Sequence, residues 1–266
     1  MVMLADVKTR RARNLAHTIP MVNKAMEMVR ALADGGDTTV KALAFRLELP
    51  HSSAYRILRS LEAQDWVRSL SGGRHELSLG LLPLLASLRD IEALAEAVEP
   101  ALRMLASHTA LTAKASIRRD DFAVTIARCE SPQATSIGVR IGARFHLALG
   151  SSGAVLLSAL PPEEARDILD RAPAECWEHQ NREAVRRRLR ELKAKGWCAD
   201  LGTFRQSCHA VSAPLQDAGG KVLAALTVIG FPNDVPDARL PELGQALQAA
   251  ARQAETALRA RKSLKK

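Results

Sequence analysis

The sequence has 266 residues, 47% of them apolar, which is enough for two ordinary globular domains with cores of their own. Aromatic residues make up only 3%, so a protein that holds single-stranded nucleic acid by stacking bases on rings is not expected. The net charge of +9 and the pI of about 9.8 fit a polyanionic partner.

Cysteine use and hydropathy limit the class of protein further. The four cysteines form no C-x-x-C pair, unlike those of a disulfide-stapled secreted scaffold. No run approaches the ~18 apolar residues of a membrane span, and no apolar segment of a signal peptide follows the first basic residues. We therefore expect a cytoplasmic protein with no membrane partner.

Residues 1–19 are predicted to be a flexible basic arm. Arg10, Arg11 and Arg13 could reach a groove or a phosphate of DNA, while a frayed terminus is the plain alternative. A first helix follows, with Pro20 just before it and Gly35-Gly36 past its end.

Two short helices joined by a tight turn are predicted next. Thr38 or Thr39 can cap the first of them, and Pro50 separates them because it disfavours helical geometry in the residue before it. In both helices apolar residues recur at helical spacing: Val40, Leu43, Ala44 and Leu47, then Ala54, Ile57, Leu58 and Leu61.

The second of these helices, Ser52–Leu61, turns mainly hydroxyl and cationic groups outward, which are groups that reach phosphates and base edges. DNA recognition by this helix is therefore predicted. For Arg56 the alternative is a salt bridge to Glu62 or Asp65. For Ser52 and Ser53 it is capping of the helix.

A β-ribbon follows, with strands predicted at Trp66–Leu70 and Arg74–Leu79 and a Gly-containing turn between them. Together these elements predict a winged helix-turn-helix domain at residues 20–80. The alternative is a helical hairpin and a β-hairpin with solvated charges. The DNA-binding candidates are Thr39, His51, Ser52, Ser53, Tyr55, Arg56, Arg59, Arg68 and Arg74.

Residues 81–108 are predicted to form a linker helix, in which Pro100 marks a kink or a break. Its apolar residues, from Ile91 to Ala106, keep a helical period. Such a face must be covered, either by the chain's own domains or by a second copy. We favour the second copy, because a winged helix that reads a pseudo-palindromic site needs a homodimer.

Residues 109–262 are predicted to be an α+β domain, an antiparallel sheet flanked by helices. Strand-like and helix-like segments alternate irregularly, and Gly150-Ser151-Ser152-Gly153 is interpreted as a loop. The expected strands are Ala113–Ile117, Phe122–Arg128, Trp197–Leu201, Ala210–Leu215 and Val222–Ile229, and the expected helices are Glu163–Asp170, Arg182–Lys195 and Leu240–Leu258.

Several stretches, in order over both domains, resemble those of the IclR family of transcriptional regulators. Leu49-Pro50-His51-Ser52-Ser53-Ala54-Tyr55-Arg56-Ile57-Leu58 is similar to the family's "GLPKSTvhRLL", and Arg74-His75-Glu76-Leu77-Ser78-Leu79-Gly80 to its "yrLG". Matches in the second domain include Gly153-Ala154-Val155-Leu156-Leu157 and Val211-Ser212-Ala213-Pro214-Leu215. The resemblance implies a C-terminal GAF-like effector domain, a dimer or a dimer of dimers, and ligand-tuned repression or activation, as in the control of catabolic genes.

The resemblance also implies a pocket for a small-molecule effector, often an organic acid or an aromatic catabolite, and no cofactor. Carried over by position, the effector-binding residues are Leu147, Gly153, Asp200, Ala210 and Ser212. Where the family usually has a histidine, a lysine and a cysteine, this chain has Ala148, Ala154 and Ala210. The effector is therefore less polar than usual, or the pocket is degenerate.

Asp200 itself has two interpretations, a pocket residue or the cap of a turn. Catalytic and metal sites are not expected, because the spacing of Cys198, Cys208 and His209 matches no zinc pattern and no hydrolase motif is present. A rival hypothesis, an enzyme built on the second domain, predicts turnover that depends on Asp200 or Cys208. A second rival is a DNA-binding protein whose sensor has degenerated.

Overall fold

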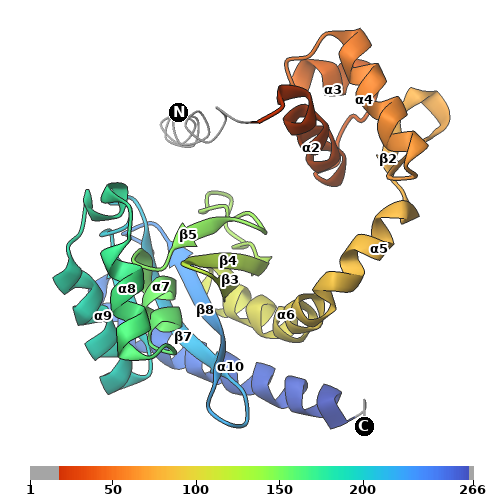
Figure 1. The fold of residues 1–266 in the computed structure, drawn as a ribbon. Coiled ribbons are helices and arrows are strands. Elements are labelled where there is room, and N and C mark those ends of the chain that lie inside the picture. The colour runs from red at the N-terminus through yellow and green to blue at the C-terminus, as the bar shows by residue number, and fades with distance from the viewer. Residues whose placement is uncertain (1–17, 264–266) are drawn as a thin grey trace. The chain divides into compact units, whose positions relative to one another are not determined.

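The computed structural model describes residues 18–263, so most of the predicted basic arm, 1–17, lies outside the described residues. The chain forms two compact units that divide after Arg89 (Figure 1). Each is described by itself. Among the described helices, none is both long and apolar enough to cross a membrane.

The first unit contains three helices, α2 (Pro20–Ala33), α3 (Val40–Arg46) and α4 (His51–Ala63). They pack around Met28, Leu43 and Leu58, which are fully buried. The Thr39 side chain caps α3 by accepting a hydrogen bond from the backbone of Ala42. Glu48 takes a φ of +53° in the turn that leads to α4, a conformation that suits glycine.

The wing is a two-stranded antiparallel ribbon of β1 (Val67–Ser69) and β2 (His75–Leu77). Gly72 and Gly73 have φ values of +75° and +68°, so the turn between the strands needs residues that tolerate the left-handed region. Thr39 pairs with Arg74 in an isolated bridge, which ties the ribbon to the start of α3. The predicted winged helix-turn-helix is confirmed.

Helical turns continue from the wing into the second unit. A 3-10 turn at Leu79–Leu81 precedes α5 (Leu82–Leu85), and another at Ala86–Leu88 precedes α6 (Arg89–Thr109). Pro100 does not end α6. It lies on the exposed side of the helix, where water can satisfy the carbonyl that loses its usual donor.

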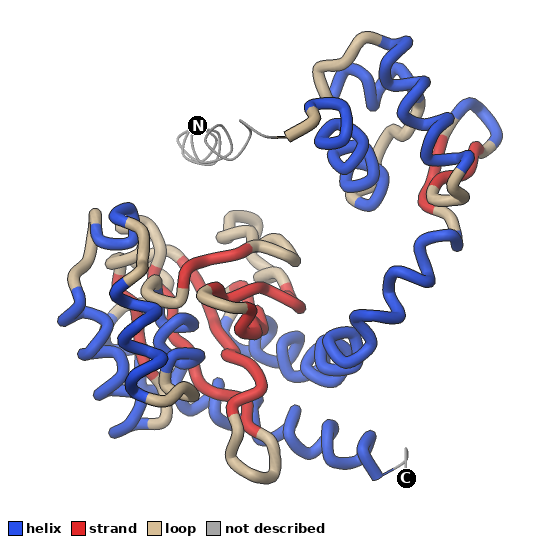
Figure 2. The backbone as a smooth tube through the Cα atoms, in the orientation of Figure 1, coloured by secondary structure: helices blue, strands red, loops and turns tan. Residues whose placement is uncertain are grey.

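The second unit is built on a six-stranded antiparallel sheet in the order β5-β4-β3-β8-β7-β6, drawn in red in Figure 2. The strands are β3 (Thr112–Arg119), β4 (Phe122–Cys129), β5 (Arg144–His146), β6 (Cys198–Leu201), β7 (His209–Gln216) and β8 (Val222–Gly230). The predicted α+β class with an antiparallel sheet is confirmed.

Helices cover both faces of this sheet (Figure 1). On one face lie α6 and α10 (Leu240–Ser263); on the other lie α7 (Gly150–Leu157), α8 (Pro162–Asp170) and α9 (Arg182–Lys195). Ala113 and Ala115 of β3 belong to the core with α6 and α10. Because side chains alternate along a strand, Lys114 and Ser116 turn toward α7.

Two predictions are corrected here. The apolar face of α6 is buried in its own domain's core with α10 from Val98 to Ala106, so the expected cover by a second copy is wrong for this part of the helix, while Ile91, Leu94 and Ala95 are partly buried against that core. The sheet itself offers α6 an apolar face, which local periodicity cannot reveal. The predicted loop at Gly150–Gly153 is the first turn of α7, because burial of the whole helix outweighs the weak helix propensity of Gly and Ser.

Candidate functional site

The outward face of α4 is the candidate DNA-reading surface. Ala54, Ile57, Leu58 and Leu61 are buried, and His51, Ser52, Tyr55, Arg56 and Arg59 are exposed on the other side of the helix. No side chain caps the start of α4, so the alternative in which Ser52 or Ser53 is the cap is wrong. These hydroxyls stay available to a ligand such as a phosphate.

The two arginines of this face differ in their partners. Arg59 donates a hydrogen bond to Glu62 at 3.1 Å, and Glu62 also bonds to Ser69. The Arg56 guanidinium makes no hydrogen bond or ion pair with any residue of the described part of the chain. Asp65 accepts a hydrogen bond from Ser78. The alternative in which Arg56 braces the fold through Glu62 or Asp65 is therefore wrong.

The wing contributes two further cations. Arg68 is engaged by Glu76, with 2.6 Å between Nε and Oε1, so a DNA phosphate would have to compete with that carboxylate. Arg74 is exposed beside Asp37. Hydrogen bonds from Thr39, and to a smaller extent the charge of Arg74, hold the pKa of Asp37 below its usual value.

In the second unit, the polar face of the sheet holds a buried chain of hydroxyls. Ser151 of α7 and Ser212 of β7 lie 2.8 Å apart, and Ser212 is 2.8 Å from Thr227 of β8. Ala210 is the register partner of Asp200 in the β6–β7 ladder. Ser212, Asp200 and Ala210 are thus brought onto one region of the sheet, and their role in binding an effector stays a prediction.

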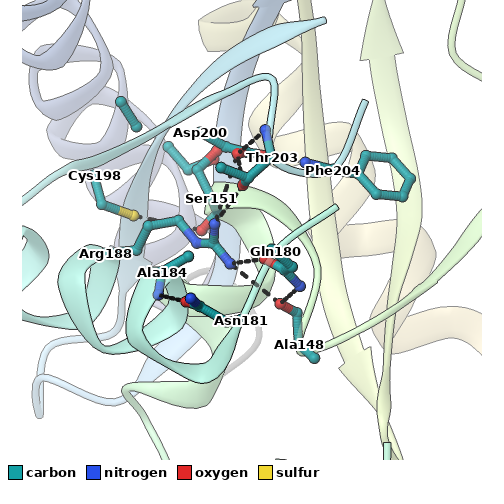
Figure 3. A network of polar contacts seen from close by, with 12 residues as sticks. Ala148, Ser151, Gln180, Asn181, Ala184, Arg188, Cys198, Asp200, Thr203 and Phe204 are labelled. Atoms are coloured by element: carbon teal, nitrogen blue, oxygen red, sulfur yellow. Dashed lines mark hydrogen bonds and ion pairs between the residues drawn. The ribbon is translucent and has the colours of Figure 1, made fainter. Parts of the chain in front are cut away.

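A buried arginine organises the rest of this region (Figure 3). Arg188 is fully buried and donates hydrogen bonds to Thr203 (2.8 Å), to Gln180 (2.7 Å) and to the carbonyl of Ala148 (3.2 Å). Its Nη1 lies 3.6 Å from Oδ1 of Asp200. Burial lowers the pKa of Arg188, and the charge of Asp200 partly offsets this effect.

The carboxylate of Asp200 is therefore already bound by groups of the protein itself. Besides facing Arg188, its carboxylate accepts hydrogen bonds from the backbone N–H groups of Thr203 (3.1 Å) and Phe204 (3.2 Å). The turn-capping interpretation of Asp200 is confirmed. Whether it also meets an effector stays a prediction.

Leu147 and Gly153 meet in the packing of α7. Leu147 is fully buried, and a Cβ added at Gly153 would lie 2.2 Å from the carbonyl oxygen of Leu147. The glycine thus permits a close approach between α7 and the segment that precedes it. Both residues have a packing role that is independent of any effector.

The thiols and the imidazole considered as metal ligands are engaged elsewhere. Burial raises the pKa of the Cys198 thiol to about 12, and Sγ lies 3.5 Å from the carbonyl oxygen of Ser151. His209 Nδ1 lies 2.9 Å from the carbonyl of Val235. Cys208 Sγ lies 3.8 Å from the hydroxyl of Ser207.

Comparison with known proteins decides the family. The model of the bacterial transcriptional regulator IclR C-terminal domain matches residues 87–256, and that of the IclR helix-turn-helix domain matches residues 21–71. The chain belongs to the IclR family. It is a transcriptional regulator whose DNA-binding unit is the winged domain described above, which confirms the predicted resemblance.

Curated IclR relatives match over most of their length. The chain is 25% identical to the transcriptional repressor AllR of Klebsiella pneumoniae, over 84% of both chains. It is 23% identical to the acetate operon repressor of Salmonella typhimurium, over 94% of this chain and 97% of that one. It is 26% identical to the Pca regulon regulatory protein of Pseudomonas putida, over 81% of this chain and 73% of that one.

Solved structures of the IclR family share the fold. The IclR of Thermotoga maritima aligns with a TM-score of 0.67 at 20% identity, covering 90% of this chain and 98% of that one. An IclR homolog from Microbacterium hydrocarbonoxydans, complexed with 4-hydroxybenzoate, aligns with a TM-score of 0.67 at 21% identity, over 90% and 98% of the two chains.

Arg188 and Lys114 are buried cations of this IclR effector domain that were not predicted from the sequence. Arg188 lies among Val185, Leu189 and Leu192, the apolar stripe of α9, and a charge in such a stripe is the signal that was available. Lys114 lies in a buried strand with small neighbours on both sides, and burial lowers its pKa to about 8.

The Arg188–Asp200 pair supplies the first prediction. Asp200→Asn should lower the free energy of unfolding by about 3–5 kcal/mol, because it leaves the Arg188 charge buried without a counter-ion. Adding Arg188→Met should recover part of this loss. Denaturant unfolding of the single and double variants measures both effects.

Asp170→Asn is the matched control for this experiment. It breaks the Arg182–Asp170 ion pair, whose side chains are about half exposed. We expect it to cost less than about 1 kcal/mol. Equal losses from Asp200→Asn and Asp170→Asn would contradict a structural role for the buried pair.

The close approach at Gly153 supplies the second prediction. Gly153→Ala should lower the free energy of unfolding by about 1–3 kcal/mol, because the new methyl group meets the backbone of Leu147. Gly138→Ala is its control, since nothing lies within 4 Å of a Cβ built there. Thermal unfolding of both variants tests the difference, and equal midpoints would contradict it.

The lowered pKa of Lys114 supplies the third prediction. Because the folded protein disfavours charged Lys114, its destabilisation is full below pH 8 and disappears as the pH rises from about 8 toward 10.5. Lys114→Met should therefore stabilise the protein by up to about 3 kcal/mol at pH 7 and by little at pH 10.5. Unfolding free energies at both pH values measure this. Lys221→Met, which removes an exposed lysine, should leave the unfolding free energy unchanged at both pH values.

Proposed function

We propose that this IclR regulator binds a pseudo-palindromic operator as a homodimer, in the cytoplasm, and that a small-molecule effector alters this binding. In this proposal α4 enters the major groove and the wing rests on the phosphate backbone. The observation that carries it is the exposed face of α4, where the guanidinium of Arg56 makes no hydrogen bond or ion pair with the described residues. A cation that braces nothing in the fold is available for guanine or for phosphate.

The homodimer is supported by apolar side chains that the first unit leaves uncovered. Leu82, Leu84, Leu85 and Leu88 are between 44% and 56% exposed. Exposed leucines clustered in one short segment are typical of an interaction surface. They replace α6 as the candidate surface for a second copy.

The effector and the target genes are proposed from the relatives. AllR and the acetate operon protein are named repressors, the third relative is named for the Pca regulon, and one IclR structure holds 4-hydroxybenzoate. We propose that this chain represses catabolic genes and responds to an organic acid or an aromatic catabolite, without a cofactor.

One observation favours a second candidate function, a DNA-binding protein with a degenerate sensor. Asp200 is neutralised by Arg188 and by backbone N–H groups, so it has less capacity left for an effector. The same engagement leaves the enzyme alternative without support at Asp200, and we propose no catalytic activity. The two sensor hypotheses differ in whether any ligand changes DNA affinity.

Arg56→Ala is the fourth prediction and tests the DNA-reading face. It should cut operator affinity, or relax base preference at one position, by about 1–3 kcal/mol, because a bidentate contact to a base edge is lost. Binding to operator and to scrambled duplex, titrated over a salt series, measures both. Wild-type affinity should fall steeply with salt.

Arg103→Ala is the control for charge alone, since Arg103 lies on α6 and pairs with Glu99. It should leave base preference unchanged. If Arg56→Ala and Arg103→Ala behave alike, Arg56 does not read DNA. If the wild type binds every duplex with the same affinity, the proposed operator recognition is wrong.

A further inference from the structure

The polar face of the effector-domain sheet holds a cation for which the described chain supplies no counter-charge. Lys114 is only 6% exposed and makes no hydrogen bond or ion pair with the described residues. Its Nζ lies 5.0 Å from the centre of the Phe145 ring. Arg188, the other buried cation among the described residues of this domain, is balanced by Asp200. At neutral pH a lysine with a pKa of about 8 is still mostly charged.

Unsatisfied hydroxyls lie next to this cation. Ser116 follows Lys114 on the same face of β3, and it is the register partner of Thr125 on β4. Both residues are 1% exposed, and neither hydroxyl has a hydrogen-bond partner. Buried polar groups are nearly always paired, so three neighbouring groups without partners indicate a missing acceptor.

The surroundings of Lys114 define what this acceptor can be. On β8 its register partner is Thr227, which begins the hydroxyl chain to Ser212. On β4 its partner is Arg128, which is engaged by Glu130 at 3.1 Å and by the carbonyl of Val139. The single positive charge of buried Lys114 matches one carboxylate. A phosphate, with a charge close to −2, would leave negative charge buried.

Aromatic rings lie over the same site. Phe145 of β5 covers the ammonium of Lys114, and its ring meets that of Phe204 edge to face, with centroids 5.4 Å apart. The chain has only five phenylalanines, so one ring over Lys114 and a second packed on the first form a local concentration of apolar surface. The Arg205 guanidinium lies 5.5 Å from the centre of the Phe204 ring. Ring edges and faces of this kind suit the apolar or aromatic body of a small molecule.

We propose that Lys114 is the residue that selects carboxylate effectors, with its ammonium on the carboxylate, Ser116 and Thr125 donating hydrogen bonds to it, and Phe145 and Phe204 against the ligand body. This inference rests on the proposed effector response. It assigns the choice of effector to β3, away from the Asp200 carboxylate that the fold already uses.

The fifth prediction tests this with the full-length chain and matched pairs of probes at pH 7 and constant ionic strength. The carboxylates are acetate, pyruvate, benzoate and 4-hydroxybenzoate, each compared with its amide, and inorganic phosphate is a separate arm. At least one carboxylate should raise the melting temperature of the wild type and of Lys221→Met, and its amide should not. Lys114→Met should weaken that carboxylate about tenfold or more in calorimetric titration, because a charge-assisted hydrogen bond is lost. Lys114→Arg should retain most of the affinity.

Three results would overturn the inference. One is a wild type that no carboxylate stabilises beyond its amide, and another is a Lys114→Met variant that binds the carboxylate as tightly as the wild type. The third is phosphate bound as tightly as the best carboxylate. Lys114→Met should melt no lower than the wild type without ligand, because it removes an unpaired buried charge, so loss of binding cannot be attributed to unfolding.

DNA affinity separates this inference from the proposed function. Without ligand, Lys114→Met should bind the operator like the wild type, and only its response to the carboxylate should be lost. If the wild type shows no operator preference, the proposed function fails whatever Lys114 binds. If operator binding is intact and Lys114→Met still responds to the carboxylate, only the role of Lys114 is wrong.

Discussion

The fold of the effector domain depends on supplying a buried guanidinium with a counter-ion and with hydrogen-bond acceptors for its two Nη groups. Removing a charge from water costs several kcal/mol even after relaxation, and Arg188 recovers this through Asp200, Thr203, Gln180 and the carbonyl of Ala148. These partners come from the end of β6, from the segments that precede α7 and α9, and from the turn after β6. One side chain therefore ties these segments together, and none of them can move far without leaving the Arg188 charge unpaired.

The second buried cation of this domain, Lys114 on β3, has different surroundings from Arg188 on α9. Lys114 has an aromatic ring over it and two unpartnered hydroxyls beside it. Arg188, in contrast, is paired with the carboxylate of Asp200. A protein under selection for stability alone would place an apolar residue at such a position, because an unpaired buried charge only destabilises. When a native sequence departs from the rules of core packing and polar satisfaction, the departure is expected at a functional or strained site. The contrast between the two cations therefore separates the part of the polar face that holds the domain together from the part that we propose for the ligand.

Much of the molecule could be predicted from local patterns. Helical spacing located α3 and α4, and His51, Ser52, Tyr55, Arg56 and Arg59 outside the apolar stripe of α4 are exposed as expected, whereas Ser53 is half-buried. What failed were statements that depend on partners far away in sequence. Nothing local shows that α6 packs on its own sheet, or that Asp200 meets an arginine on α9. The start of α7 was missed because Gly and Ser favour loops, and burial of the helix from Ser151 to Leu157 outweighs that preference.

Regulation by a ligand on this sheet has to satisfy a quantitative constraint. A ligand at one hundred times its dissociation constant stabilises the state it binds by only about 2.7 kcal/mol, whereas moving an equilibrium from 1:99 to 99:1 requires about 5.5 kcal/mol. A site with one cation and two hydroxyls therefore regulates well only if the unliganded protein is already close to balance between DNA-competent and incompetent arrangements.

Lys114 is on β3, which follows α6 almost directly, and α6 begins where the winged unit ends. Helical turns connect the two units without a gap from Leu79 onward. The covalent path from Lys114 to the wing thus runs through α6 and the helical turns before it. By linkage, any factor by which a carboxylate changes operator affinity must equal the factor by which the operator changes carboxylate affinity.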